Sequence, residues 1–271
     1  MCLVVCPRYL SLTLLKIPHT QMHRINILGV RVNDVDAKAL ERSIIDCVEQ
    51  KKKATFAYAN VHAINIAQRN QRFREFLNNS DILYCDGEGL RLAARVLGAT
   101  PPRRTALTHW IWDLARTLEE RRYSVYLLGG RNEVVAGAVR RLCGRYPCLK
   151  LAGYHHGYFD KSEKESAAVI MTINSVKPNV LFVGFGMPEQ EMWVERNLTQ
   201  LEVNAVILCG GMFDYLAGES TVAPRWMSVN GMEWLHRLLH DPARLWKRYL
   251  LGNPVFLFRI LLQRLAEGRQ I

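Results

Sequence analysis

Short hydrophobic runs alternate along the chain with longer segments in which hydrophobic residues recur every three or four positions. The short runs are typical of buried strands, and the longer segments are typical of amphipathic helices. Their regular alternation predicts an α/β protein with a Rossmann-like, mostly parallel sheet and helices on both faces. The predicted strands are 24–32 (a strand or a hairpin), 55–60, 81–85, 124–130, 149–154, 179–186 and 204–211, and the predicted helices are 34–53, 61–79, 88–97, 107–121, 132–146, 162–175 and 188–198.

The N-terminal segment, residues 1–22, does not follow this pattern. It is hydrophobic, but Pro7 and Arg8 interrupt it and no basic stretch precedes its hydrophobic part. Its uninterrupted runs are too short to span a bilayer, and the segment differs from a secretory signal. We interpret residues 1–22 as a poorly ordered leader and residues 23–222 as the α/β domain.

The C-terminal segment, residues 223–271, has no strand pattern and is basic. We expect Pro242 and Pro254 to divide it into short amphipathic helices. Tryptophan, leucine and phenylalanine are interleaved with arginine, which is typical of helices at a membrane interface. The pattern predicts a helical appendage with a membrane-contact face. It contains eight basic residues (225, 237, 244, 247, 248, 259, 264, 269) and three acids (233, 241, 267).

The composition and net charge of the chain indicate which kinds of molecule it binds. The chain has 271 residues, 49% of them hydrophobic, and a formal net charge of +11. This size is sufficient to bury a full core, and the charge favours an acidic partner such as nucleotide phosphates, a lipid surface or nucleic acid. No recognisable nucleic-acid-binding motif is present, so we expect no nucleic-acid partner. The seven irregularly spaced cysteines form no metal-ligand pattern, and we expect no metal site.

Five predicted strands end in small or polar residues. Because the carboxyl ends of parallel strands meet at one edge of a sheet, these positions predict a ligand crevice. Glycine turns also occur for connectivity alone, so the pattern indicates a site without proving one. The positions are Asn60, Asp86, Gly129–Gly130, Gly184–Gly186 and Gly210–Gly211.

Asp86 is the first candidate for chemistry. It follows a hydrophobic run directly and precedes a helical segment. In that place it is either a general base or ribose-binding carboxylate, or an N-cap that accepts hydrogen bonds from free helix N–H groups. The spacing leaves these readings open.

The segment GFGMPEQE, residues 184–191, is the second candidate. Its G-x-G start matches the first part of the dinucleotide-binding motif G-x-G-x-x-G. Glu189, however, occupies the position of the third glycine, where its negative charge would repel a pyrophosphate. We therefore expect no nicotinamide cofactor. Gly186 and Pro188 instead predict a tight turn that directs backbone N–H groups and Gln190 toward the crevice, where a phosphate or sugar hydroxyl can bind.

Several motifs, in order and covering about residues 25–262, resemble the WecG/TagA/CpsF glycosyltransferases. They include NVHAINIAQRNQRFREFLNNSDILYCDGEGLRLAARVLG, VYLLGG, HHGYF, LFVGFGMPEQEMW, GGMFDYLAG and the segment from APRWM to GNPVFL. The resemblance implies an inverting transfer of a hexose or N-acetylhexosamine-type sugar without a metal or other cofactor. The donor would be a UDP-sugar, the acceptor a polyprenyl-diphosphate-linked saccharide, and the product a cell-surface or exopolysaccharide precursor.

The resemblance also implies roles for individual residues. Asp86 opens the D-G-x-G turn as the catalytic base. From the basic helical pattern of the appendage, we separately expect Arg237, Arg244 and Arg248 to close the site or bind the diphosphate. The arginine of the family's site matches Arg104. Its neighbour Arg103 is the alternative if the match shifts by one residue. Tyr58 departs from the family's T-x-N pattern, which bears on sugar preference. The expected substrate-binding residues are Asn60, Tyr58, Arg104, Gly129, Gly184, Gly186, Gln190 and Glu191.

The three appendage arginines follow each other at i, i+7 and i+11, so they share one face if a single helix continues through Pro242. Together with the lipid-linked acceptor, they lead us to expect a cytoplasmic enzyme, peripheral on the inner face of the cell membrane. The oligomeric state, including a homo-oligomer, stays open. The alternative functions are a nucleotide-binding Rossmann-type oxidoreductase and a non-catalytic membrane-associated binding protein.

Overall fold

The computed structural model describes residues 23–267 of the chain, so the interpretation of residues 1–22 as a leader lies outside the described residues. Within the described range, the predicted α/β fold is confirmed: eight strands form one sheet in the order β1-β2-β4-β3-β8-β7-β5-β6. Only the β1–β2 pairing is antiparallel. The strands are β1 (Arg24–Ile27), β2 (Val30–Asn33), β3 (Ala54–Ala59), β4 (Ile82–Cys85), β5 (Ser124–Gly129), β6 (Lys150–His155), β7 (Val180–Gly184) and β8 (Ala205–Leu208).

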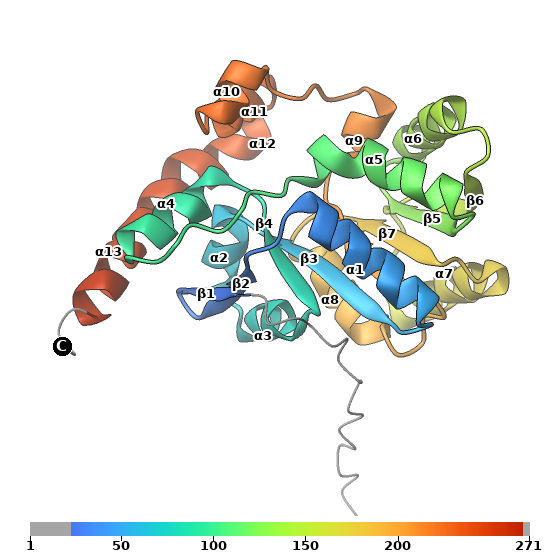
Figure 1. The fold of residues 1–271 in the computed structure, drawn as a ribbon, viewed down its shortest axis with the longest axis horizontal. Helices are drawn as coiled ribbons and strands as arrows, with labels where there is room; N and C mark the ends of the chain where they lie inside the picture. Colours follow the sequence, from blue (N-terminus) through green and yellow to red (C-terminus); the bar gives the residue numbers. More distant parts are fainter. Residues whose placement is uncertain (1–22, 268–271) are drawn as a thin grey trace, which may run out of the picture.

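Helices connect the strands and continue beyond the last one (Figure 1). Those of the α/β domain are α1 (Ala37–Glu49), α2 (Val61–Ala67), α3 (Gln71–Asn79), α4 (Glu88–Val96), α5 (Leu107–Glu120), α6 (Asn132–Arg145), α7 (Glu163–Val176), α8 (Glu189–Asn197) and α9 (Met212–Ala217). Those of the appendage are α10 (Arg225–Val229), α11 (Glu233–His240), α12 (Pro242–Trp246), the π-helix η1 (Lys247–Leu251) and α13 (Gly252–Glu267).

The core lies on both faces of the sheet. Strand residues alternate between two hydrophobic clusters because successive side chains point to opposite faces. Phe56 and Ile82 pack with α1, α5, α6 and α9 on one face. Ala57 and Leu83 pack on the other face with α2, α3, α4, α7 and α8, and α13 of the appendage joins this second cluster.

The order of the strands places a switch point at the centre of the sheet. From β3 the chain proceeds to β4 on one side, whereas β8, β7, β5 and β6 extend to the other side. In open α/β sheets, ligands bind outside the carboxyl ends of strands at such a point. The carboxyl ends of β3, β4, β7 and β8 are therefore the expected place for a site.

Two predicted helix boundaries are wrong. The segment 61–79 forms two helices rather than one, because Asn70 interrupts it and its side chain accepts a hydrogen bond from Phe73 N (3.0 Å), starting α3. Pro254 does not divide the appendage: the helical backbone continues from α12 through η1 into α13. The wider turn of the π-helix just before Pro254 accommodates a residue that lacks the N–H of a regular helix.

Candidate active site

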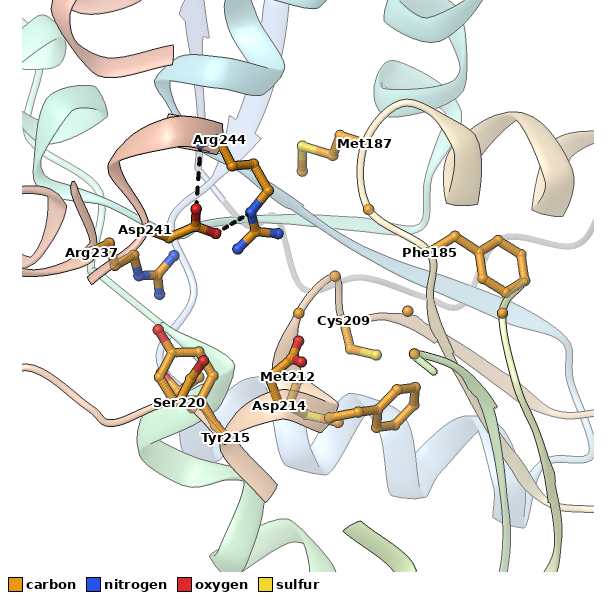
Figure 2. A pocket seen from close by; sticks show the side chains of 18 of the residues that line it. Phe185, Met187, Cys209, Met212, Asp214, Tyr215, Ser220, Arg237, Asp241 and Arg244 are labelled. Atoms are coloured by element: carbon orange, nitrogen blue, oxygen red, sulfur yellow. Dashed lines mark hydrogen bonds and ion pairs between the residues drawn. The ribbon is translucent and has the colours of Figure 1, made fainter. Parts of the chain in front are cut away.

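A cavity of about 1250 Å³ opens at the carboxyl ends of the central strands. Its floor and walls come from the strand ends, and residues of α11, α12 and η1 line its other side. In Figure 2, Arg237 and Arg244 reach toward the cavity from the appendage, opposite Asp214 and Tyr215. The structure therefore brings together the α/β domain and the appendage at one site.

Asp86 lies in this cavity, directly after β4. Its backbone N–H donates to Ala59 O (2.8 Å), which holds the residue at the end of the sheet. The helix that follows, α4, has Gly87 at its N-cap and no side-chain capping bond. The N-cap interpretation of Asp86 is therefore wrong, and the residue lines the cavity instead.

Burial raises the pKa of Asp86, and three arginines around it act in the opposite direction. Arg237 has the largest of these opposing effects, ahead of Arg104 and Arg248. The negative charge of Glu233 adds to the rise. A carboxyl group with a raised pKa is a better proton acceptor than an ordinary aspartate and remains ionised only above its shifted pKa.

Tyr58, near the end of β3, and Asn60, directly after it, also line the cavity. Asn60 caps α2, because its Oδ1 accepts from Ala63 N (3.1 Å), which leaves its amide nitrogen for a ligand. The phenol of Tyr58 lies against Gly210, and burial, with Glu191 and Asp86 nearby, keeps its pKa far above the usual value. Tyr58 is therefore a neutral hydrogen-bond donor beside Asp86.

The predicted glycine residues have two different roles. Gly184 and Gly186 line the cavity, as does Gly130, whereas Gly129 does not. A Cβ on Gly129 would lie 2.3 Å from Gly184 O, so Gly129 is required for close packing of β5 against β7. The prediction that Gly129 binds substrate is not supported by this placement.

Gln190 and Glu191 are fully buried and do not line the cavity, contrary to the expected turn geometry. Gln190 Oε1 accepts from Gly210 N (3.0 Å), and its Nε2 donates to Glu191 Oε1 (2.8 Å). Their side chains face the protein interior, whereas Glu189, in the same first turn of α8, lines the cavity. Gln190 thus ties α8 to the turn after β8.

The three predicted appendage arginines all line the cavity, although they do not lie on one continuous helix. The helix does not continue through Pro242: α11 ends at His240, and the extended Asp241 begins a new helix by accepting a hydrogen bond from Arg244 N (3.3 Å). Asp241 also accepts from Arg244 Nε at 2.5 Å. The change in helix direction, rather than one continuous face, brings these cations to the cavity.

Arg104 does not line the cavity. Its guanidinium donates to Ser228 O (3.1 Å) and pairs with Glu233, so it connects the α/β domain to the appendage. Its neighbour Arg103, the alternative register, points elsewhere and pairs with Asp34 and Asp36. Of these two arginines, Arg104 is the one whose positive charge lowers the pKa of Asp86.

Sequence reasoning missed several residues of the cavity. Asp214 lies opposite the appendage arginines, and burial raises its pKa despite the nearby Arg244 and Arg131. Asp214 lies in the first turn of α9, three residues after the glycine pair that follows β8, so it lacks the position directly after a hydrophobic run that identified Asp86. His62 also lines the cavity, and burial, with Arg248 nearby, lowers its pKa to about 4, so it is neutral. Nothing in its sequence context distinguished it.

Residues 23–267 contain no group of three or more His, Cys, Asp or Glu side chains arranged to hold a metal ion. In the same range, no helix is both long and apolar enough to cross a bilayer.

Comparison with known proteins agrees with the resemblance seen in the motifs. The Glycosyl transferase WecG/TagA/CpsF family matches residues 25–270. The N-acetylglucosaminyldiphosphoundecaprenol N-acetyl-beta-D-mannosaminyltransferase of Staphylococcus aureus strain MW2 is 32% identical over 241 residues, covering 88% of this chain and 92% of that protein. The protein of the same name from strain MRSA252 is 31% identical over the same coverage. With the family match spanning both the α/β domain and the appendage, this chain belongs to the WecG/TagA/CpsF family of glycosyltransferases.

Proposed function

We propose that this glycosyltransferase moves a hexose or N-acetylhexosamine-type sugar from a UDP-sugar to a polyprenyl-diphosphate-linked saccharide, with inversion and without a metal. The names of its relatives specify transfer of N-acetylmannosamine to a diphosphoundecaprenol-linked N-acetylglucosamine, which supports this class of acceptor. Family membership argues against the oxidoreductase and the non-catalytic binding protein.

The placement of Asp86 carries the proposal. A sugar hydroxyl is a poor nucleophile at neutral pH because its pKa is far above 7. Asp86 faces the cavity, caps no helix and has a raised pKa, so it can accept the proton of the acceptor hydroxyl as that oxygen attacks the anomeric carbon. A single displacement from the side opposite the departing diphosphate inverts the anomeric centre.

The departing UDP acquires negative charge that must be stabilised. Arg237, Arg244 and Arg248 line the cavity, and guanidinium groups bind phosphate oxygens in bidentate geometry. Backbone N–H groups of the turn at Gly184–Gly186 lie at the same edge of the sheet. These groups can supply the electrostatic stabilisation that a divalent cation supplies in other transferases.

The appendage also supports a position at the membrane surface. Its last helix, α13, exposes Phe258, Leu261 and Leu265 to solvent. A polyprenyl-linked acceptor lies in a bilayer, so an exposed apolar helix face on the appendage would bring the enzyme to its substrate. We propose that the protein is peripheral on the inner face of the cell membrane.

Replacing Asp86 by Asn tests the base. The amide keeps the size of the side chain but cannot take the proton, so kcat should fall by about 10²- to 10⁴-fold. UDP release is measured with a panel of UDP-sugars and diphosphoundecaprenol-linked N-acetylglucosamine, and thermal unfolding checks the fold. Asp113→Asn, on the exposed surface of α5, is the matched control and should retain wild-type turnover. A folded Asp86→Asn protein with normal turnover would contradict the proposal.

Metal independence is tested in the same assay. If arginines and backbone N–H groups stabilise the leaving UDP, adding EDTA should leave the rate unchanged. If EDTA abolished the activity and adding Mg²⁺ or Mn²⁺ restored it, a divalent cation would be needed to stabilise the leaving UDP, contrary to the proposal.

A further inference from the structure

Glu233 joins the appendage to the α/β domain beside the cavity. It is the first residue of α11, and its side chain is only 18% exposed. Its carboxylate pairs with Arg104, accepts from His109 Nε2 (3.2 Å) and accepts from the Ser228 hydroxyl. The first two partners belong to the α/β domain, and Ser228 lies in α10.

Arg104 connects this cluster to the strand that carries the base. Its backbone forms a parallel bridge with Cys85, the residue before Asp86, and Thr105 N donates to Cys85 O (2.8 Å). From that fixed position, the Arg104 guanidinium reaches both Glu233 and Ser228 O. The start of α11 is therefore tied to the end of β4.

The carboxylate of Glu233 is ionised in this arrangement. Burial raises its pKa, but hydrogen bonds from His109, Ser228 and Arg104 outweigh burial and hold the pKa well below the usual range. The pairing with Arg104 therefore persists at every pH at which Asp86 can act as a base.

No residue of α11 is fully buried, so its polar contacts carry much of the burden of holding it in place, together with the packing of Trp234 near the Tyr249 ring. Arg237 lies one helical turn after Glu233, so the two side chains share a face of α11. The Arg237 guanidinium stacks over the Tyr215 ring (5.6 Å to its centroid) and is the cation with the largest effect on Asp86. Any movement at Glu233 would move Arg237 relative to Asp86.

We propose that Glu233 is a positioning residue for the transfer reaction: by binding Arg104 and His109, it holds α11 so that Arg237 faces Asp86. The inference rests on the proposed function, because it assigns Glu233 to the geometry of that same site. Glu233 itself does not line the cavity, so its effect on the reaction would be indirect.

A double-mutant cycle tests the proposal, using Glu233→Gln, Arg237→Gln and the double variant in the UDP-release assay. The amide keeps the volume of Glu233 and removes the charge that binds Arg104, so kcat/KM should fall by about 10- to 100-fold through misplacement of Arg237. If Glu233 acts through Arg237, the double variant should be within about twofold of Arg237→Gln alone. Losses that multiply, or a Glu233→Gln protein within about twofold of wild type, would overturn the proposal.

Glu195→Gln is the matched control. It breaks the ion pair between Arg72 of α3 and Glu195 of α8, which also joins two elements but does not line the cavity. It should change kcat/KM by less than about twofold in the wild-type and Arg237→Gln backgrounds.

Amide hydrogen exchange of residues 233–240 gives a readout that does not depend on activity. Glu233→Gln should accelerate exchange in α11, whereas Glu195→Gln should not. Unchanged exchange in Glu233→Gln would contradict the positioning role even if activity fell. If the wild-type protein transferred no sugar at all, the proposed function would fail, and the exchange experiment would still decide whether Glu233 holds α11.

Discussion

Asp86 and Glu191 are both carboxylic acids enclosed by the protein, and their surroundings give them different tasks. Asp86 faces the cavity and a group of arginines, whereas Glu191 is sealed under the strand ends. One oxygen of Glu191 accepts from Gln190, and the other finds no partner within the described part of the chain. Asp86 is therefore suited to proton transfer during turnover, and Glu191 to a structural role in the protonated form.

The protonation of Glu191 predicts a pH dependence of stability. Burial raises its pKa to about 8, from 4.5 for an ordinary glutamate. Between these values the unfolded chain has lost the proton and the folded protein retains it. The free energy of unfolding should therefore fall as pH rises through this window, with each pKa unit worth about 1.4 kcal/mol.

Glu191→Gln removes this titration. Urea unfolding at about pH 5 and about pH 8 should show a smaller loss of stability in the variant than in the wild type. Equal losses in the two proteins would mean that Glu191 is ionised in the folded state.

At the scale of elements, α13 shows how one helix combines two environments. Phe256 and Ile260 are buried against the α/β domain, where α13 runs beside α4 and contacts α2 (Figure 1). Phe258 and Leu265 are each 62% exposed on the outer side. The inner face anchors the appendage, and the outer face leaves apolar side chains exposed to solvent.

Phe258→Ser should weaken binding to vesicles that contain phosphatidylglycerol by about tenfold. The variant loses the free energy that the wild-type phenylalanine ring gains when it moves from water into the bilayer. Its thermal unfolding should match that of the wild type, since Phe258 is mostly exposed in the folded protein. Met171→Ser on α7, which removes another strongly exposed side chain, is the control in a vesicle sedimentation assay. Equal affinity of the two variants for vesicles would place the membrane contact elsewhere.

At the scale of the whole molecule, the cavity is a joint product of the α/β domain and the appendage. The sheet contributes Asn60, Asp86 and the glycine turns, and the appendage contributes three arginines from separate helical segments. Because α13 packs against the α/β domain and Glu233 pairs with Arg104, both ends of the appendage are fixed around the cavity. A cation such as Arg237 can therefore lie far along the chain from Asp86, whose pKa it lowers.

The sequence was most informative where its signal was local and repeated. Short hydrophobic runs predicted every strand from β3 to β8. The signal is strongest in β4, β7 and β8, because a parallel strand buried along its whole length has a hydrophobic residue at almost every position. The same reasoning placed Asn60, Asp86 and the glycine turns at one edge of the sheet. It failed at Gln190 and Glu191, since the direction of a side chain in the first turn of a helix depends on what packs against that helix.

By itself, the sequence determined the α/β architecture, the strand ends that form the site and the presence of a basic helical appendage. Each of these follows from local hydrophobic periodicity and from backbone preferences of nearby residues. Only the tertiary structure decided that Asp86 caps no helix, that Gln190 is buried and that Arg237, Arg244 and Arg248 meet at one cavity. These outcomes depend on contacts between segments distant in sequence, such as Arg104 with Glu233, which no local pattern encodes.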